Sequence, residues 1–314
     1  SAGGYRVTKT GAGTLTLSSG SSFDGITMQA GTLSLMGGNT FPGGVRLEGG
    51  TIQIRHSDAL GAQPLTVLGG GLASSAITCP NGLVIDGTLS RVGGVSGNQT
   101  LTFTGTASLT GSRTIDTTTD GNGSNHLKLD GAITATGSGY RITKMGGATL
   151  TLAGDSTFDG GVVVSNGVIL VGHANALGAG DLTFAGGYVH VLVNDYTVTN
   201  RVRAPYPFLI GTSSLGTALK TLTLAGPVEL SGNTRVFTYF LSYSPNTHRH
   251  LAISGPISDG AEFYGLRKTG YSGEATLTLS GTNTFDGGIV MDSGVTRLTG
   301  DNTGVIGGIV NNYG

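Results

Sequence analysis

Three aspartates recur at matching places in the sequence and are the first candidates for chemistry. Asp24, Asp159 and Asp286 each lie in a Phe-Asp-Gly corner. Glycoside hydrolysis requires two carboxylates at a defined separation, and a calcium site requires several clustered oxygen ligands. These aspartates are single and far apart in the sequence, and aspartate tolerates the left-handed backbone conformation that tight turns use. We therefore interpret all three as turn formers.

The remaining candidate groups also lack partners in the sequence. Asp116 and Asp120 flank a run of threonines that we interpret as a loop, with a carboxylate pair as the alternative. His56 and His173 recur beside Ala-Leu-Gly, and a metal site would need further ligands clustered with them. The segment 154–157, Gly-Asp-Ser-Thr, departs from a serine-esterase motif at its fourth residue. We expect no catalytic residue, no metal and no cofactor, so the chain is predicted not to be an enzyme.

The composition describes a chain with many turns and little charge. It has 314 residues, of which 58 are glycine, one is cysteine and none is tryptophan, and only 11% are charged. The net charge of −1 gives no field that attracts nucleic acid or an anionic membrane. No apolar run approaches the roughly 18 residues of a membrane span, so we expect none. Cys79 is alone, and we interpret it as a small buried apolar residue.

Internal repeats are the strongest signal in the sequence. Three blocks share a Thr-Leu-Thr-Leu run followed by a Phe-Asp-Gly corner, and they begin near Tyr5, Tyr140 and Leu266. From one block to the next, the Thr-Leu-Thr-Leu run and the Phe-Asp-Gly corner are displaced by the same number of residues. We predict one domain, 1–314, built of two large repeats and a partial third, at about 5–139, 140–265 and 266–314.

A shorter period lies inside the large repeats and predicts stacked coils of β-strands, each of about 18–19 residues. Phe23 recurs as Phe41, and Gly31-Thr32-Leu33 recurs as Gly50-Thr51-Ile52. Alternation with period two is typical of strands, and no stretch shows helical periodicity. The fold class predicted is an all-β, right-handed parallel β-helix (β-solenoid) in one elongated domain. The leucines of the repeated runs should point inward: Leu15, Leu17, Leu150, Leu152, Leu277 and Leu279. The threonines should point outward: Thr14, Thr16, Thr149, Thr151, Thr276 and Thr278.

The repeated residues resemble a known family, the autotransporter-associated β-strand repeat. Lys9 to Leu17 fits its Lys-x-Gly-x-Gly-Thr-Leu-Thr-Leu stretch, Thr157 to Gly161 fits its corner, and Ala176 to Thr183 fits its Ala-Leu-Gly tail. The resemblance covers residues 5–72, 140–191 and 266–308. It implies a β-helix in a protein that is secreted or displayed on a bacterial cell surface.

One segment breaks the pattern, and we consider it as a contact surface. Residues 188–264 hold 6 of the 10 tyrosines and 4 of the 10 phenylalanines. Exposed aromatic and arginine side chains are favoured at interfaces, whereas the alternative is that they fill a wider core. The candidate contact residues are Arg201, Arg203, Tyr206, Phe208, Tyr239, Tyr243 and Arg249.

The two ends show no polar cap, although solenoids normally carry one. We predict that they are assembly edges and that copies of the chain stack head to tail into an extracellular fibre or stalk. The start of the chain, which suits a mature protein, favours this hypothesis over a passenger fragment that acts as an adhesin on a host-cell or matrix glycan or protein. A polysaccharide lyase or hydrolase is the third hypothesis. The candidate edge residues are Tyr5, Val7, Leu15, Leu17, Val305, Ile306, Ile309 and Val310.

Overall fold

The computed structural model of the chain describes most residues in parallel β-strands. The description covers residues 4–18, 20–93, 99–120, 123–191, 194–205, 209–210, 220–231, 234–238, 249–260, 262–270 and 276–312. In these residues every regular element is a strand, and the strand pairings are parallel except for one short hairpin. The chain forms two compact units, Ser1–Gly160 and Gly161–Gly314. The predicted parallel β-solenoid is confirmed, while the organisation as one domain stays a prediction.

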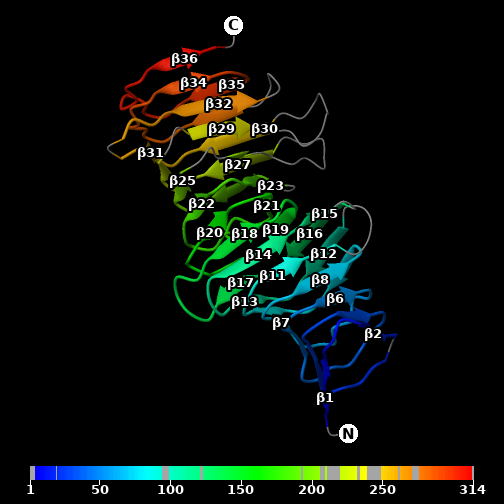
Figure 1. Ribbon diagram of the computed structural model, residues 1–314. Helices are drawn as coiled ribbons and strands as arrows, with labels where there is room; N and C mark the ends of the chain where they lie inside the picture. Colours follow the sequence, from blue (N-terminus) through cyan, green and yellow to red (C-terminus); the bar gives the residue numbers. More distant parts are fainter. Residues whose placement is uncertain are drawn as a thin grey trace. The chain divides into compact units, whose positions relative to one another are not determined.

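The strands of the first unit form three parallel sheets, in which neighbouring strands come from successive coils of the chain (Figure 1). Sheet 1a contains, in order, β1 (Arg6–Lys9), β3 (Gly25–Met28), β5 (Val45–Leu47), β7 (Leu65–Val67), β10 (Leu83–Ile85), β13 (Ala107–Leu109) and β17 (Ile133–Ala135). Sheet 1b contains β2 (Thr14–Leu17), β4 (Thr32–Leu35), β6 (Thr51–Ile54), β8 (Gly71–Ser74), β11 (Leu89–Arg91), β14 (Arg113–Thr117) and β18 (Ile142–Met145). Sheet 1c contains β9 (Ile77–Cys79), β12 (Gln99–Phe103), β16 (Gly123–Leu129) and β19 (Thr149–Leu152), with β15 (Thr119–Asp120) in a hairpin with β16.

The second unit is built in the same way. Sheet 2a contains β20 (Val162–Val164), β22 (Leu182–Phe184), β25 (Val202–Ala204), β28 (Val228–Leu230) and β31 (Ile257–Ser258). Sheet 2b contains β21 (Val168–Val171), β23 (Tyr188–Val191), β26 (Leu209–Ile210), β29 (Thr234–Thr238), β32 (Leu266–Gly270), β34 (Ile289–Met291) and β36 (Ile309–Asn311). Sheet 2c contains β24 (Tyr196–Val198), β27 (Lys220–Leu224), β30 (Arg249–Ile253), β33 (Thr276–Leu279) and β35 (Val295–Leu298).

The coils have two widths, which corrects the prediction of one uniform short period. In the early coils Ile26 pairs with Val45, as the short period requires. Further on, Leu101 pairs with Leu127, so the chain between paired strands is longer there. In the first unit the longer coils contain a third strand, because sheet 1c receives one strand from each of them. A long coil uses more residues for the same axial rise, so fewer coils fit in the chain than the short period predicts.

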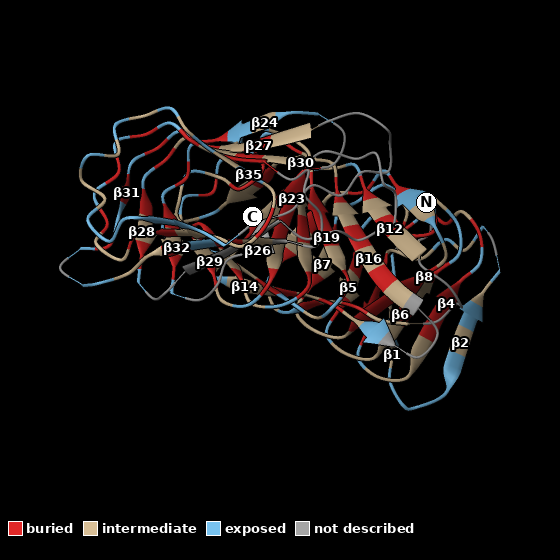
Figure 2. Ribbon diagram, turned by 90° about the horizontal axis from the view of Figure 1, so that it is seen from above, coloured by how far each residue is buried: buried red, intermediate tan, exposed pale blue. Residues whose placement is uncertain are grey.

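Strand alternation places an apolar row inside each coil (Figure 2). The inward side chains of the coils are almost completely buried, as with Leu33, Ile52, Leu101 and Leu127. The predicted inward leucines of the two later runs are buried too: Leu150, Leu152, Leu277 and Leu279. Leu15 and Leu17 are half-buried, because their strand lies at the edge of sheet 1b.

The outward threonines follow the prediction only in part. Thr14 and Thr16 are exposed, but Thr151 and Thr276 are only 6% and 5% exposed. Alternation sets the direction of a side chain, whereas its exposure also depends on its neighbours on the sheet. Thr151, for example, pairs with Lys128, whose side chain is longer. The prediction that these two threonines face solvent is therefore wrong. The other two, Thr149 and Thr278, are partly exposed.

The corners between strands are fixed by glycine and asparagine. In the Phe-Asp-Gly-Gly corners the left-handed conformation falls on the second glycine, with φ of 79° at Gly161 and 72° at Gly288. No described residue other than glycine has a positive φ, so the interpretation that aspartate adopts this conformation is wrong. Buried asparagines bind the corner carbonyls instead, as where Asn39 Nδ2 donates to Gly37 O and Ala59 O. These bonds satisfy carbonyls that the strand ladders leave free.

Candidate assembly edges and contact surface

The first predicted edge is formed by β1, the outermost strand of sheet 1a. Its Tyr5 and Lys9 carbonyls accept hydrogen bonds from Asp24 N and Gln29 N of the next coil. Because neighbouring residues of a strand point their backbone groups to opposite sides, Arg6 and Thr8 direct theirs away from β3. Tyr5 is 87% exposed and Val7 is half-buried. Of the predicted edge residues, Tyr5 and Val7 lie at and on this strand, whereas Leu15 and Leu17 lie on β2, the outermost strand of sheet 1b.

The second predicted edge is formed by β36, the outermost strand of sheet 2b. Gly308 O accepts from Ile289 N, and Asn312 N donates to Met291 O. By the same alternation the backbone groups of Ile309 point away from β34. The edge carries apolar side chains: Ile306 is 70% exposed and Val310 is 48% exposed. This is a β-prone edge with apolar side chains beside backbone groups that point away from the sheet, a combination that favours pairing with another strand.

The candidate contact surface is described only around Arg201 and Arg203. Both arginines form ion pairs with carboxylates on neighbouring coils. Arg201 contacts Glu229, and Arg203 Nε lies 2.5 Å from Asp181 Oδ2 while its Nη1 lies 3.3 Å from Glu229 Oε2. The bond with Asp181 raises the pKa of Arg203. Tyr206, Phe208, Tyr239, Tyr243 and the Arg249 side chain lie outside the described residues. The contact surface therefore stays a prediction.

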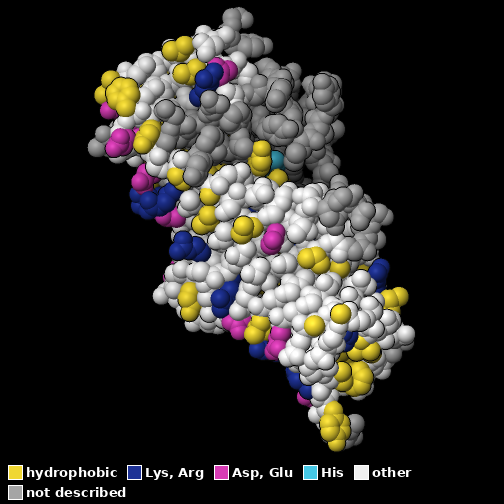
Figure 3. Space-filling model, in the orientation of Figure 1, with side chains coloured by type: hydrophobic (Ala, Val, Ile, Leu, Met, Phe, Trp, Pro, Cys, Tyr) yellow, Lys and Arg dark blue, Asp and Glu magenta, His cyan; other side chains and the backbone are white. Residues whose placement is uncertain are grey.

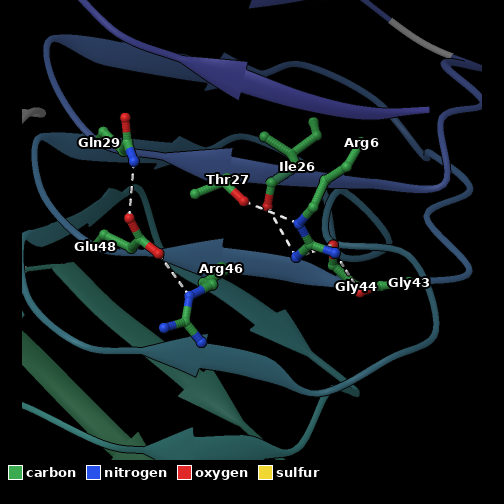
Figure 4. A network of polar contacts seen from close by, with 8 residues as sticks. All are labelled: Arg6, Ile26, Thr27, Gln29, Gly43, Gly44, Arg46 and Glu48. Carbon is green, nitrogen blue, oxygen red and sulfur yellow. Dashed lines mark hydrogen bonds and ion pairs between the residues drawn. The ribbon is translucent and has the colours of Figure 1, made fainter.

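The outer face of sheet 1a carries hydrogen bonds that join neighbouring coils and one ion pair within a coil (Figure 4). Arg6 Nε donates to Thr27 Oγ1 at 2.9 Å, and its Nη1 donates to Gly43 O at 3.0 Å. Glu48 accepts from Arg46 at 2.6 Å and from Gln29 at 3.0 Å, and these bonds lower the pKa of Glu48. On the face shown in Figure 3, basic and acidic side chains likewise lie near one another on a mostly uncharged surface.

A set of inward-facing cations was not predicted from the sequence. Lys144, Lys268 and Arg91 are fully buried, each near the end of its strand and close to a corner. Lys144 Nζ donates to Met145 O at 2.6 Å and to Gly146 O at 2.7 Å. Such buried charges require hydrogen-bond partners, and here the partners are carbonyls of the corner.

Two of the repeated lysines, Lys9 and Lys268, bind the next coil. Lys9 pairs in register with Met28, and Lys9 Nζ donates to Ala30 O, just beyond that partner, at 3.0 Å. Lys268 repeats this arrangement. It pairs with Met291, and Lys268 Nζ donates to Ser293 O at 2.6 Å.

Arg91 makes the equivalent contacts to the preceding coil. Its Nη1 donates to Leu72 O and its Nη2 to Ser74 O, at 2.9 and 2.8 Å. The signal in the sequence was the recurrence of Lys9, Lys144 and Lys268 at matching places. We call Lys9, Arg91, Lys144 and Lys268 the corner cations.

Burial changes the pKa values of these groups and their neighbours. It lowers the pKa of Lys144 to about 8, against the opposing effect of the Asp116 carboxylate. Burial also lowers the pKa of Lys268 to about 8. Burial, together with the charges of Arg91 and Lys144, lowers the pKa of His126, whose Nδ1 accepts from Thr149 N at 3.0 Å. The buried cations and His126 thus bind backbone groups of the corners.

Asp159 and the two recurring histidines have structural partners. Asp159 Oδ1 accepts from Gly139 N at 2.7 Å. His56 Nδ1 accepts from Asp58 N, and His173 Nδ1 accepts from Asn175 N, both at 3.1 Å. Each imidazole thus caps its own turn with one of its two nitrogens. Among the described residues no three His, Cys, Asp or Glu side chains could hold a metal ion together.

The fold and these contacts define a class of protein: a parallel β-solenoid in which buried polar side chains fix the corners. A family comparison then identifies the repeats. Residues 7–28, 29–54, 142–171 and 271–290 match the Passenger-associated-transport-repeat family. The predicted autotransporter-associated repeats are therefore confirmed, and they associate this chain with passenger proteins. No curated protein and no solved structure matched the chain. In the described part of the chain, no helix is long and apolar enough to cross a membrane.

Proposed function

We propose that this chain is a structural passenger, secreted or displayed on a bacterial cell surface, whose coils serve as a scaffold. The observation that carries the proposal is that four segments match a repeat of passenger proteins. Two of them, 7–28 and 29–54, cover successive coils from β1 to β6. Of the groups considered for chemistry, Asp159 binds a corner amide, and His56 and His173 each cap their own turn. The chain has no catalytic role in this proposal.

The finer proposal is that copies of the chain associate head to tail. It is supported by the two edges, β1 and β36, which direct backbone groups of Thr8 and Ile309 outward. Parallel pairing of β36 with β1 of a second copy would satisfy these groups and cover Tyr5 and Ile306. The association is heterologous, so it continues as a filament instead of closing. Low charge at both edges reduces repulsion between copies.

Proline substitutions on the two edges test the association. Thr8→Pro and Ile309→Pro each remove one outward N–H without removing a hydrogen bond to β3 or β34. Sedimentation and negative-stain imaging should show filaments for the unmodified chain and monomers for each proline variant. Thr8→Ala and Ile309→Ala should still assemble, because both keep the N–H group.

A mixture of the two proline variants makes the test specific. Each variant retains one intact edge, so the mixture should give one-to-one dimers that grow no further. An unmodified chain that remains monomeric at high concentration contradicts the fibre, and the passenger adhesin then takes its place. Filaments from either proline variant alone would show that copies of the chain associate through residues other than the β1 and β36 edges.

The absence of catalysis is tested separately. We expect no turnover of uronic-acid or neutral polysaccharides by the purified chain. Turnover that is lost on changing Asp116→Asn would contradict the scaffold proposal and support a hydrolase or lyase.

A further inference from the structure

Two Asn-Gly dipeptides of the chain lie in opposite chemical environments. An asparagine followed by glycine is the dipeptide best suited to spontaneous loss of the side-chain amide, because glycine does not hinder approach of its own backbone nitrogen. Asn166-Gly167 forms the corner between β20 and β21, and Asn81-Gly82 lies just before β10. A third, Asn122-Gly123, has its asparagine outside the described residues.

The first dipeptide has its reacting groups close together. The Asn166 side chain is exposed to solvent. Gly167 N lies 2.7 Å from Asn166 Oδ1, which brings the backbone nitrogen next to the side-chain carbonyl group. Gly167 has a φ of 68°, a left-handed conformation that glycine adopts without strain. The nucleophile, the electrophile and water are therefore all available at this corner.

The second dipeptide has the same residues, but its side chain is held. Asn81 is only 3% exposed. Its Nδ2 donates to Gly61 O at 2.7 Å and to Gln63 O at 2.8 Å, so the amide nitrogen, which is the leaving group, is bound by the preceding coil. Moving this side chain would break both hydrogen bonds, which slows the reaction in the folded chain.

We propose that Asn166 is a site of spontaneous modification and that Asn81 is protected. In the reaction, Gly167 N loses its proton and attacks Asn166 Cγ. The new C–N bond closes a five-membered succinimide ring, and the side-chain nitrogen takes up the proton and leaves as ammonia. Water then opens the ring at one of its two carbonyls. One opening gives aspartate at 166, and the other gives isoaspartate, in which the main chain runs through the β-carbon.

Both products change the corner. Each adds one negative charge to a chain whose net charge is −1. Isoaspartate also adds a methylene group to the main chain between Val164 and Val168, where the two strands must keep their register. A chain that carries isoaspartate should therefore be less stable than one that carries aspartate at the same place.

Peptide mapping measures the two sites separately. Trypsin releases residues 56–91, whose one asparagine is Asn81, and residues 145–201, which contain Asn166. The folded chain is incubated at mildly alkaline pH and digested, and fragment ions locate the mass gain of amide to acid. We expect modification at Asn166 to increase with time and with pH, while Asn81 stays intact. In denaturant both sites should react, because the protection of Asn81 depends on the fold.

Two variants complete the test. Asn166→Ser places at this corner the residue that Ser293 supplies in the last repeat, and it should abolish the mass gain at position 166. Asn81→Ser should leave the rate at Asn166 unchanged. If Asn166 remains intact in the folded chain, or if Asn81 reacts as fast as Asn166 there, the proposal is wrong.

Discussion

The first unit contains two kinds of coil, and their comparison explains much of its architecture. Residues 6–74 form short coils with one strand in sheet 1a and one in sheet 1b. Residues 77–152 form longer coils that also supply a strand to sheet 1c. Pairing in sheet 1a shows the change directly: Arg46 pairs with Thr66, whereas Val84 pairs with Ser108, which lies further along the chain from its partner. We call the two kinds narrow coils and wide coils.

The two kinds of coil also differ in what they bury. Among the described residues 20–74, the buried polar side chains are uncharged. In residues 77–152 the coils bury two full charges, Arg91 and Lys144. A third strand adds a corner to every coil, and carbonyls at a corner fall outside the strand ladders. The long side chain of Lys144 reaches such carbonyls from a fully buried position in a wide coil, whereas Lys9 does so from a half-buried position in the first narrow coil. We infer that the buried cation contributes more to stability.

The largest effect is expected from charges placed in the core of either kind of coil. Leu101→Asp in a wide coil and Ile52→Asp in a narrow coil should each lower the free energy of unfolding by several kcal/mol, because both side chains are fully buried. Their outward neighbours, Thr102→Asp and Gln53→Asp, should cost under about 1 kcal/mol. Urea denaturation measures all four. Equal losses of stability within either pair would show that the inward and outward side chains of that strand are wrongly assigned.

Removal of a corner cation should separate the two kinds of coil. Lys144→Met keeps the volume of the side chain but leaves Met145 O and Gly146 O without their donor. We expect a loss of about 2–4 kcal/mol, since a hydrogen bond to a charged group contributes about 1.5–3 kcal/mol. Lys9→Met is the matched control in the first coil, where water reaches the freed carbonyls and the loss should stay below about 1 kcal/mol. Equal losses of stability in Lys144→Met and Lys9→Met would contradict the difference between the two kinds of coil.

The pH dependence of stability should carry the signature of the same lysine. Lys144 has a pKa of about 8 in the folded protein, below its ordinary 10.5. Below pH 8 the lysine is charged in both states, and burial of its charge destabilises the folded protein. Between pH 8 and 10.5 the folded protein releases this proton before the unfolded chain does, so the destabilisation decreases as the pH rises. Stability should therefore rise above pH 8, by up to about 1.4 kcal/mol per pH unit and lysine. Lys268 contributes in the same direction.

The measurement compares the free energy of unfolding at pH 8 and pH 9 in the unmodified chain and in Lys144→Met. The variant should lose part of the rise in stability. An unchanged slope of stability against pH would contradict the assignment of the pKa of about 8 to Lys144. Cys79 sets the upper limit of this window, because burial raises its pKa from 9.0 to about 12 and makes stability fall with pH above 9.

The smallest effect is expected at the surface ion pairs, which occur on both kinds of coil. The Arg46–Glu48 pair lies on a narrow coil and the Arg113–Asp86 pair on wide ones. Both are partly exposed, so Arg46→Ala and Arg113→Ala should each change stability by at most about 1 kcal/mol. High salt should reduce even this difference. A larger loss at Arg113 would show that the wide coils depend on surface pairs as well as on corner cations.

Much of the narrow coils could be predicted from the sequence, because their period repeats with few changes. The recurrence of Gly31-Thr32-Leu33 as Gly50-Thr51-Ile52 matches the pairing of Leu33 with Ile52, both of which are fully buried. The wide coils were missed, since the third strand shifts the period without altering the alternation inside each strand. Gln99–Phe103, for example, alternates like any other strand, and only its pairing partners place it in a separate sheet.

The candidate site was predicted less completely. Tyr5 and Ile306 are exposed as expected of edge residues, but their partner is not tested. The arginines at 201 and 203 were predicted as contact residues, and their ion pairs with Asp181 and Glu229 could not be anticipated. Those carboxylates become neighbours only when the coils stack. The corner cations were visible as a repeated lysine, yet their role depends on carbonyl positions that only the folded corner provides.

Disulfide formation across neighbouring coils tests the change of period most directly. In a Cys79→Ser background, cysteines at Val84 and Ser108 face each other on adjacent parallel strands, within the Cα separation of about 4.4–6.8 Å that a disulfide accepts. This pair should cross-link rapidly on mild oxidation, as shown by a mobility shift and by mass spectrometry. If the short period continued unchanged, Val84 would instead lie beside Thr102. Rapid cross-linking of cysteines at Val84 and Thr102, with none between Val84 and Ser108, would contradict the account of two coil widths.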